Sequence, residues 1–395
     1  MYACAVIGAG PAGTGALRQL ADAGVRDIAV IDPCPVNRAG TLADYAIGSD
    51  TRASKLLSLF PDGPSLADAR RRLSRYGHGS APLQVAGEAL RDLGSWCVRK
   101  AAAQPIRARA TSLQQQHEGW QIPTSGGLTL QARSVVLALG GVEVAERGPA
   151  LLKQYGIDRP VLLSGKVLAG HAKPSGHVAI LGGSHSAMAV AGWLLRKDPE
   201  VHVTLLHRSA LNPTYANIAE ATAEGAAFTA DDVCAQTGRV FALGGFRLDA
   251  AELLLRYRAG REPRLSLLQT DQTDLCHDTL QDADTVVSAL GYAPRSIPVF
   301  DLSGRVTDLQ PHVDSASRVT AKSGAPLPGL FRLGLAAGLD LAGRFGEPGF
   351  RGQANGLALW HRDVGADIAS RVKARADADL GTRHDENKLQ PLRTA

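Results

Sequence analysis

A glycine-rich turn early in the chain has the residue types and the spacing that bind a phosphate group. It consists of Gly8, Gly10, Pro11, Ala12 and Gly13, and it follows an apolar run and precedes a helical pattern. In such a unit the first glycine lets the chain turn, the second lets the backbone approach a pyrophosphate, and the third lets helix and strand pack closely. The N-terminus of the helix faces the phosphate charge. The turn therefore predicts a dinucleotide site.

The chain repeats this design once. An apolar pattern over residues 178–181 leads into a turn that contains Gly182, Ser184 and Ser186, and a helical pattern follows. The second glycine is replaced by Ser184 and the third by Ala187, and both replacements are small enough to allow close approach. We interpret the repeat as an internal duplication of the nucleotide-binding unit. His185, inside this turn, is expected to face solvent or the nucleotide backbone.

The residue that ends the next strand differs between the two units. Asp32 ends the first of these strands and is placed to accept hydrogen bonds from an adenosine ribose, but it would repel a 2′-phosphate. Arg208 stands at the equivalent point of the second unit and can pair with a 2′-phosphate through bidentate bonds. The difference assigns NADPH to the second site and FAD to the first. The alternative is that Arg208 is merely solvated.

The composition indicates a globular protein of two or three domains. The chain has 395 residues, of which 45% are hydrophobic and 21% charged. The formal net charge is +5, but lysine and arginine are spread along the chain. We therefore expect no nucleic-acid partner, and at most a modest preference for anionic ligands.

The cysteines are isolated in the sequence, with no CxxC or CxxxxC pair: Cys4, Cys34, Cys97, Cys234 and Cys276. This spacing argues against a disulfide framework, a zinc site and a redox-active dithiol. No apolar run approaches the ~18 residues of a membrane span, and no basic region followed by an apolar one opens the chain. We expect a cytoplasmic protein without a metal or a membrane partner, and the oligomeric state stays open.

The remaining patterns complete an α/β fold. Residues 83–101 have helical spacing, and residues 134–141, 284–294 and 329–335 read as strands. We predict two Rossmann-like dinucleotide-binding domains, with the NADPH domain (166–296) inserted into a discontinuous FAD domain. The FAD domain would cover 1–165 and 297–371, and 372–395 would form a flexible tail. The long connection over 33–80 is either a lid or a cover for the sheet, and its role stays open.

In its order of motifs, the chain resembles the flavoproteins with two dinucleotide-binding domains. Among these it is most similar to the NADPH-dependent flavin monooxygenases, and nearest to the ornithine and lysine N-hydroxylases. G-A-G-P-A-G resembles the family's FAD turn, and G-G-S-H-S-A resembles its G-x-G-x-S-A turn for NADPH. The stretch D-T-V-V-S-A-L-G-Y-A-P resembles D-x-x-x-x-A-T-G-Y-x-P. The closing G-E-P-G-F-R-G-Q-A-N-G resembles the helix that lies against the flavin.

The resemblance implies a reaction and a set of residues. FAD reduced by NADPH would activate dioxygen as a C4a-(hydro)peroxyflavin and oxygenate a small amine or related nucleophile. Gly140 and Gly334 would contact the cofactor. The segment N-P-T-Y-A-N-I-A-E resembles D-x-S-x-F-x-N-E, which gives Asn217 a nicotinamide or substrate contact, with Ser164 on the same side. The residues expected near the flavin are Gln353, Asn355 and Glu347.

The sequence also departs from this family. Leu163 and Val167 stand where the family has the His and Tyr of H-S-x-x-Y, and the F-x-G-x-x-x-H signature is missing. We see no W-H-x-x-M in the first loop and no counterpart of the amino-acid-binding lysine. Two alternatives therefore stay open. One is an FAD-dependent NAD(P)H oxidoreductase or oxidase that does not oxygenate, and the other is a non-catalytic flavoprotein.

Overall fold

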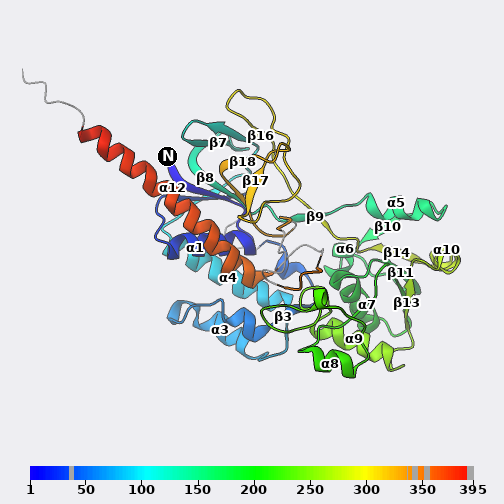
Figure 1. Ribbon diagram of the computed structural model, residues 1–395. Coiled ribbons are helices and arrows are strands. Elements are labelled where there is room, and N and C mark those ends of the chain that lie inside the picture. Colours follow the sequence, from blue (N-terminus) through cyan, green and yellow to red (C-terminus); the bar gives the residue numbers. More distant parts are fainter. Residues whose placement is uncertain (35–39, 336, 340–345, 351–355, 389–395) are drawn as a thin grey trace, which may run out of the picture.

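Two sheets organise the chain, and Figure 1 shows the units built on them side by side. The computed structural model describes residues 1–34, 40–335, 337–339, 346–350 and 356–388. The chain builds most of the first sheet, crosses to the second, and returns to the first. The expected fold class, α/β with one Rossmann-like unit inserted into another, is therefore confirmed.

The first sheet has nine strands, in the order β16-β6-β7-β8-β1-β2-β5, with β18 beside β8 and β17 beside β18. Strand β1 lies between β8 and β2, and all three are parallel, with Val6 opposite Val136 and Val30. The strands are β1 (Tyr2–Ile7), β2 (Ile28–Asp32), β5 (Gln104–Arg107), β6 (Leu113–Gln116), β7 (Gly119–Pro123), β8 (Thr129–Leu137), β16 (Val299–Phe300), β17 (Arg318–Thr320) and β18 (Pro326–Arg332).

One face of this sheet is covered by helices. Helix α1 (Pro11–Asp22) packs against α4 (Leu83–Lys100), α11 (Leu357–His361) and α12 (Asp363–Lys388). Leu17 and Leu20 of α1 are buried against the strands because they lie three residues apart and so share one helix face. A second apolar cluster around Trp120 fills the other face of the sheet.

The second sheet has five parallel strands in the order β10-β14-β11-β12-β13. They are β10 (Val161–Leu163), β14 (Thr285–Ser288), β11 (His177–Leu181), β12 (His202–His207) and β13 (Leu265–Gln269). Its helices are α5 (Arg147–Gln154), α6 (Ser164–Leu168), α7 (His185–Lys197), α8 (Ile218–Ala223), α9 (Leu248–Arg258) and α10 (Thr273–Asp282). The strands read as continuous apolar runs because helices cover both faces.

Two short antiparallel ribbons lie at or near the junction of the units. Strands β9 (Gly141–Glu143) and β15 (Tyr292–Pro294) pair where the chain leaves and re-enters the first unit. Strands β3 (Gly48–Arg52) and β4 (Ser80–Pro82) pair within the long connection, where β3 packs against α9 of the second unit. Short helices complete this connection and the second unit: α2 (Ala53–Leu57), α3 (Ala67–Ser74) and the 3-10 helices Leu42–Asp44, Pro64–Leu66 and Ala230–Asp232.

One predicted boundary differs from the structure. We placed residues up to 165 in the first domain, but β10 pairs with β14, and Leu152 of α5 packs in a core with Ala179 and Val286. The segment 147–163 therefore belongs to the second sheet. Our prediction divided the chain at residue 165, whereas the crossing occurs at β9, directly after Gly140.

The C-terminal segment also differs from its prediction. We assigned residues 372–395 to a flexible tail, but helix α12 includes residues 372–388, and 389–395 lie outside the described residues. Val372 is fully buried in the core of the first unit, and Lys373 forms an ion pair with Asp377 one turn later. Burial of one face and pairs of this spacing favour a helix although the segment is strongly charged.

Two negative findings concern the described residues alone. None of their helices combines the length and the apolar character that crossing a membrane requires. No three histidine, cysteine, aspartate or glutamate side chains of this part of the chain are grouped so that they could hold a metal ion.

Candidate functional site

The first glycine turn leaves open space where the sequence predicts a pyrophosphate. Gly8 has a φ of +103°, and a Cβ there would lie 2.3 Å from the carbonyl oxygen of Ala138. A Cβ on Gly13 would lie 1.9 Å from the carbonyl oxygen of Gly8, so both positions require glycine for packing. A Cβ on Gly10 would lie 3.9 Å from its nearest neighbour, the Cα of Gly40, so this position has open space. No side chain caps helix α1, whose first N–H groups therefore face this space.

Asp32 at the end of β2 holds the same turn in place. One carboxylate oxygen accepts a hydrogen bond of 2.7 Å from the backbone N–H of Ala9, and the other accepts one of 2.8 Å from that of Cys34. Each carboxylate oxygen can accept a further hydrogen bond. Asp32 is therefore able to fix the turn and to bind a ribose hydroxyl at the same time.

Gly140 and Gly334 lie near this edge of the first sheet. Gly334 has a φ of +109°, and a Cβ there would approach that of Ala12 to 2.8 Å, which places Gly334 directly beside the turn. Gly140 has a φ of +72° with nothing within 4 Å of a Cβ.

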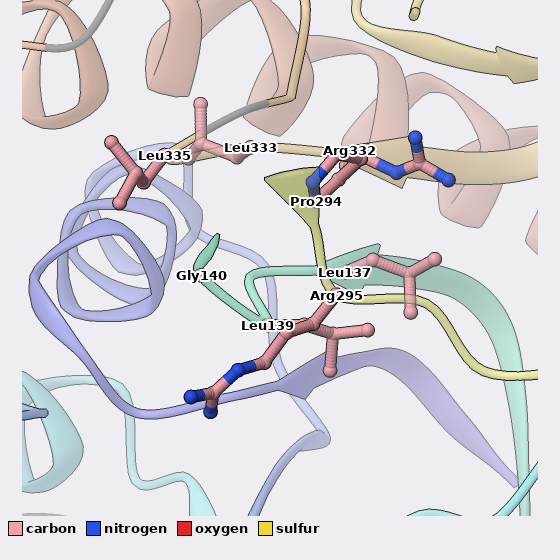
Figure 2. A pocket seen from close by; sticks show the side chains of 8 residues that line it. All are labelled: Leu137, Leu139, Gly140, Pro294, Arg295, Arg332, Leu333 and Leu335. Atoms are coloured by element: carbon pink, nitrogen blue, oxygen red, sulfur yellow. The ribbon is translucent and has the colours of Figure 1, made fainter. Parts of the chain in front are cut away.

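Figure 2 shows a small cavity at Gly140, where the side chains of Arg295 and Arg332 point away from one another. Its volume is about 10 Å³, enough for about one water molecule, so it is not a substrate pocket.

The second turn repeats the geometry of the first. Gly182 has a φ of +128°, and a Cβ there would lie 2.6 Å from the carbonyl oxygen of Ala289. A Cβ on Gly8 would approach the carbonyl oxygen of Ala138 in the same way. Ser184 is exposed and precedes α7, and its side chain makes no capping hydrogen bond. Ser186 is half-buried in the first turn of the helix, and Ala187 is fully buried at the position of Gly13. The uncapped N-terminus of α7 can therefore receive a second pyrophosphate.

Arg208 lies at the carboxyl end of β12, directly after His207. A Cβ on Gly183 would approach the Cβ of His207 to 3.0 Å, so this strand end lies against the second turn. Arg208 is exposed, and its backbone carbonyl accepts a hydrogen bond of 3.3 Å from the side chain of Gln269. Within the described residues its guanidinium has no ion pair, so it can meet a phosphate at the edge of the site.

The structure gives His185 a different environment from the one we expected. Its ring meets that of Phe246 edge-on, with centroids 5.3 Å apart, and its Nε2 is buried without a hydrogen-bond partner in the described part of the chain. Burial, together with the nearby charge of Arg247, lowers the pKa of His185 to about 4. The imidazole is therefore neutral near pH 7. Its Nε2 can either donate or accept a hydrogen bond, depending on the tautomer.

An ion pair beside His185 joins the two units. Arg247, just before α9, donates a hydrogen bond of 2.8 Å to Asp50 on β3. Burial alone would raise the pKa of Asp50, but the charge of Arg247 and the hydrogen bonds from Arg247 and Thr51 outweigh burial and lower the pKa below its usual value. Neither Asp50 nor Arg247 was singled out from the sequence, because they are 197 residues apart and belong to no motif.

Glu347 forms a second link between the units. Its buried carboxylate accepts hydrogen bonds of 2.9 and 3.0 Å from the N–H of Leu243, and one of 2.7 Å from that of Gly244. The sequence predicted that Glu347 lies near the flavin. In the structure its carboxylate holds the loop that leads to Arg247.

The other predicted residues near the reaction centre are placed as follows. Ser164 is buried and donates a hydrogen bond to Glu143, which also accepts one of 2.9 Å from the N–H of Gly165. Asn217 is exposed and caps α8, where its side-chain oxygen accepts a hydrogen bond of 2.9 Å from the N–H of Glu220. Gln353 and Asn355 lie outside the described residues.

A larger cavity of about 540 Å³ lies between the β3–β4 ribbon and helices α7 and α9. Its lining is mixed in charge, since Asp249 and Glu252 face it together with Arg196 and Arg256. A cavity of this size can take a small molecule.

Two helix N-termini without a side-chain cap define the class of protein, because each follows a glycine with a positive φ at the carboxyl ends of parallel strands. This class is that of the flavoproteins with two dinucleotide-binding units, the second inserted into the first. The residues at both turns fit a dinucleotide. Residues 2–304 match the family described as pyridine nucleotide-disulphide oxidoreductase, and the chain belongs to that family.

A curated relative covers nearly the whole chain. The CMP-5'-(3-aminopropyl)phosphonate hydroxylase of Streptomyces rubellomurinus is 30% identical over 438 residues, which cover 96% of this chain and 99% of the relative. The predicted similarity to the N-hydroxylating flavoproteins is confirmed by solved structures at the level of the fold, and the chain is a flavin-dependent oxidoreductase.

Solved structures of several activities share the fold. The ornithine N-hydroxylase of Kutzneria sp. 744 has a TM-score of 0.58 at 16% identity, covering 95% of this chain and all of that chain. The L-lysine 6-monooxygenase of Pseudomonas syringae has a TM-score of 0.56 at 16% identity, with the same coverage. The thioredoxin reductase of Lactococcus lactis has a TM-score of 0.53 at 14% identity, covering 96% of this chain and all of that chain.

All five cysteines are described, and none forms a disulfide. Four are buried, and only Cys34 is partly exposed. Burial raises the pKa of the Cys4 and Cys97 thiols to about 12, which makes them poor nucleophiles. The chain therefore lacks the paired reactive thiols that the family description suggests.

Proposed function

We propose that the protein is an FAD- and NADPH-dependent monooxygenase that oxygenates a small amine or a related nucleophile in a specialised biosynthetic pathway. The observation that carries the proposal is the similarity to a hydroxylase along almost the whole of both chains. The preserved geometry of both glycine turns supports it, because both cofactors need such turns.

The first turn would hold FAD and the second NADPH. Asp32 would bind the adenosine ribose of FAD, and Arg208 would pair with the 2′-phosphate of NADPH. When bound, FAD would take hydride from NADPH and activate dioxygen as a C4a-(hydro)peroxyflavin. The remaining contacts that we propose for the cofactors are those of Gly8, Gly10, Pro11, Ala12, Gly13, Gly140, Gly334, Gly182, Ser184 and Ser186.

The chain's own residues would bind and orient the reactants and exclude water. Asn217 uses only its side-chain oxygen for the cap of α8, so its amide NH₂ stays available for nicotinamide or substrate. Gln353 and Asn355 are proposed on the flavin side from the resemblance alone. Ser164 is already bonded to Glu143, which suits it to position the start of α6 beside the junction.

The chemistry of the relative's substrate suggests the substrate class. Its printed name combines an aminopropyl group, a phosphonate and CMP. An amine is the nucleophile that a hydroxylase of this type would oxygenate, and the phosphonate and nucleotide would add negative charge. We therefore propose an amine with an anionic group as the substrate of this chain.

Isotope labelling tests this function. The FAD-loaded protein is given NADPH, ¹⁸O₂ and a panel of amines, including aminoalkyl phosphonates with and without a linked nucleotide. We expect a product that gains one ¹⁸O atom for each NADPH consumed. Stopped-flow absorbance after mixing the reduced protein with oxygen then tests the proposed flavin–oxygen adduct.

One observation favours a second candidate, an FAD-dependent NAD(P)H oxidoreductase or oxidase. Leu163 and Val167 replace the family's His and Tyr, and Val167 is fully buried in the core of the second unit, where it has no polar role. NADPH consumption that yields only hydrogen peroxide with every amine would support this candidate. A flavin that NADPH never reduces would point to a non-catalytic flavoprotein.

A further inference from the structure

The cavity of about 540 Å³ between the two units has no part in the proposed reaction. Its first wall comes from the long connection of the first unit, with residues 46–48, Tyr76, Ser80 and Pro82. Its second wall is helix α9, which lies beside β3 (Figure 1), together with Arg196 near the end of α7. The described residues that line it belong to neither glycine turn. We call this space the ribbon cavity.

Helix α9 turns one face toward the ribbon cavity. Its lining residues are spaced at i, i+3, i+4 and i+7: Asp249, Glu252, Leu253 and Arg256. Residues at this spacing lie on the same side of a helix. Leu253 is buried, and the other three side chains carry charges. The face therefore combines a small apolar centre with charged groups that a polar ligand can contact.

Two oxygen atoms occupy the space above Gly48 on β3. A Cβ on Gly48 would lie 2.4 Å from Oγ of Ser80 and 2.5 Å from Oδ2 of Asp249, so the two oxygens are neighbours. The Ser80 hydroxyl donates its proton to the carbonyl oxygen of Ser49 at 2.8 Å. Both oxygens are therefore acceptors, and the described part of the chain offers the Asp249 carboxylate no donor. An ammonium group would supply N–H donors to both.

The guanidinium of Arg196 folds back along α7 toward α9. A Cβ on Gly192 would lie 3.3 Å from Nη1 of Arg196 and 3.4 Å from Cδ2 of Leu253, so the guanidinium and the leucine lie beside one another. Arg196 is exposed and has no ion pair within the described ranges of the chain. Asp249 precedes Leu253 by four residues, which is ~6 Å along the axis of α9. The cavity thus offers a negative and a positive group a few bonds apart.

The other charged side chains of the lining are paired. Arg256 lies 3.3 Å from Glu262 and 3.8 Å from Glu252, and Glu262 also pairs with Arg264 at 3.3 Å. These two guanidinium groups and two carboxylates balance one another. The two charges that remain are the carboxylate and the guanidinium described above, and they also sum to zero. Such a cavity favours a ligand that has no net charge but carries one charge of each sign.

We propose that the ribbon cavity binds a small zwitterion, with an ammonium group and an anionic group, at a site separate from both dinucleotide turns. The ammonium group binds Asp249 and Ser80, and the anionic group binds Arg196. A cavity of this volume has room for such a molecule. Because Ser80 belongs to the first unit and the other two residues to the second, the ligand contacts both units and stabilises their present arrangement.

Calorimetry on the FAD-loaded protein with saturating NADP⁺ tests the site without turnover, because NADP⁺ occupies the second turn. The probe is 4-aminobutyrate, and butylamine and butyrate each carry only one of its two charges. The variants are Asp249→Asn and Arg196→Gln. Asp274→Asn is a matched control, since this exposed aspartate is the second residue of α10 as Asp249 is of α9. Lys197→Gln removes an exposed charge beside Arg196 that does not line the cavity.

We expect 4-aminobutyrate to bind, and each variant to raise its Kd about tenfold while both controls leave it unchanged. Butylamine and butyrate should bind about tenfold more weakly, because each uses one end of the site. Gly48→Ala is a third variant and should weaken binding as well, since its methyl group would displace the two acceptor oxygens.

Three results would overturn the inference: no binding of 4-aminobutyrate, an unchanged Kd in Asp249→Asn or Arg196→Gln, or equal binding of the probes that carry one charge. Steady-state oxygenation separates this site from the proposed function. Both variants should leave the KM of an oxygenated amine unchanged, and a rise of that KM would make the cavity the substrate site. A protein that binds 4-aminobutyrate here but never oxygenates an amine would contradict the proposed function alone.

Discussion

The carboxylate of Glu347 and the backbone N–H of Gly244, 103 residues apart in the sequence, are joined by a hydrogen bond of 2.7 Å. The N–H of Leu243 bonds to the same carboxylate. A buried carboxylate is stable only when hydrogen bonds replace its lost hydration, so this contact fixes the loop before α9 against the C-terminal part of the first unit. The loop carries Arg247, which in turn pairs with Asp50.

We predict that Glu347→Gln lowers the stability of the folded protein by about 1–3 kcal/mol, because the amide removes the charge and one of the acceptor oxygens that the two N–H groups need. Thermal melting of the FAD-loaded protein measures the change. Glu224→Gln, at an exposed position, is the control and is expected to melt like the wild type. Equal melting temperatures for all three proteins would contradict a structural role of Glu347.

Gly13→Ala is predicted to abolish FAD binding. The new methyl group would lie 1.9 Å from the carbonyl oxygen of Gly8, so helix α1 would have to move away from the turn. The flavin-to-protein absorbance ratio after purification measures the loss. Gly126→Ala tests the general cost of such a change, because a Cβ there meets nothing within 4 Å. Full flavin content in Gly13→Ala would show that this turn does not hold FAD.

The sequence predicted these turns because their signal is local. Glycines at fixed spacing between an apolar strand and a helical pattern specify a strand–turn–helix unit from about 20 residues. The structure confirms the strands, turns and helices at Gly8 and Gly182. The cofactor contacts assigned to them stay predictions, since the geometry shows only that the space and the donors exist.

The contacts between the units could not be predicted in this way. The Asp50–Arg247 pair and the Glu347 clamp join residues that are far apart in the sequence, and each residue alone looks like an ordinary surface charge. The same limit explains the misplaced boundary at 165. Whether Val161–Leu163 pairs with the first or the second sheet depends on its partner strand β14, more than 100 residues later, and not on its own apolar pattern.

Arg208→Gln is predicted to raise the KM for NADPH roughly tenfold to a hundredfold and to leave that for NADH nearly unchanged, because only NADPH has the 2′-phosphate. Steady-state rates of flavin reduction with the two cofactors measure the ratio. Arg261→Gln, which removes another exposed arginine of the second unit, should keep the preference of the wild type. A parallel rise of both KM values would mean that Arg208 does not contact this phosphate.

Stability is predicted to fall as the pH drops from about 6.5 to about 4. Burial lowers the pKa of His361 to about 4, from a usual value of 6.5, so the unfolded chain takes up a proton in this range while the folded chain does not. Proton uptake by the unfolded state favours unfolding, and the loss at pH 5 is about 2 kcal/mol for this group. His185, with a pKa also lowered to about 4, adds to the effect.

Urea unfolding of His361→Gln at pH 7.5 and pH 5 tests the contribution of His361. The glutamine amide can still donate to the carbonyl oxygen of Pro11, as the ring Nε2 does at 2.9 Å, but it does not titrate. The difference in unfolding free energy between the two pH values should shrink by about 2 kcal/mol. His202→Gln, at an exposed position on β12, is the control. An unchanged difference in His361→Gln would assign the pH dependence to other groups.

The cysteines allow a test that separates this chain from the disulphide-reducing activity in its family's description. Reduction of a disulfide needs a reactive thiolate and a second thiol beside it. Four of the five cysteines are buried, and none of the five forms a disulfide with another. Cys34 is partly exposed, but its contact with Asp32 uses the backbone N–H, which a substitution keeps. We therefore predict that Cys34→Ser retains the flavin and consumes NADPH at the wild-type rate.

The wild type should also fail to reduce an aromatic disulfide reagent with NADPH under anaerobic conditions. Catalytic reduction of that reagent, lost in Cys34→Ser, would show that one thiol relays electrons from the flavin, and it would replace oxygenation by thiol chemistry as the reaction to pursue.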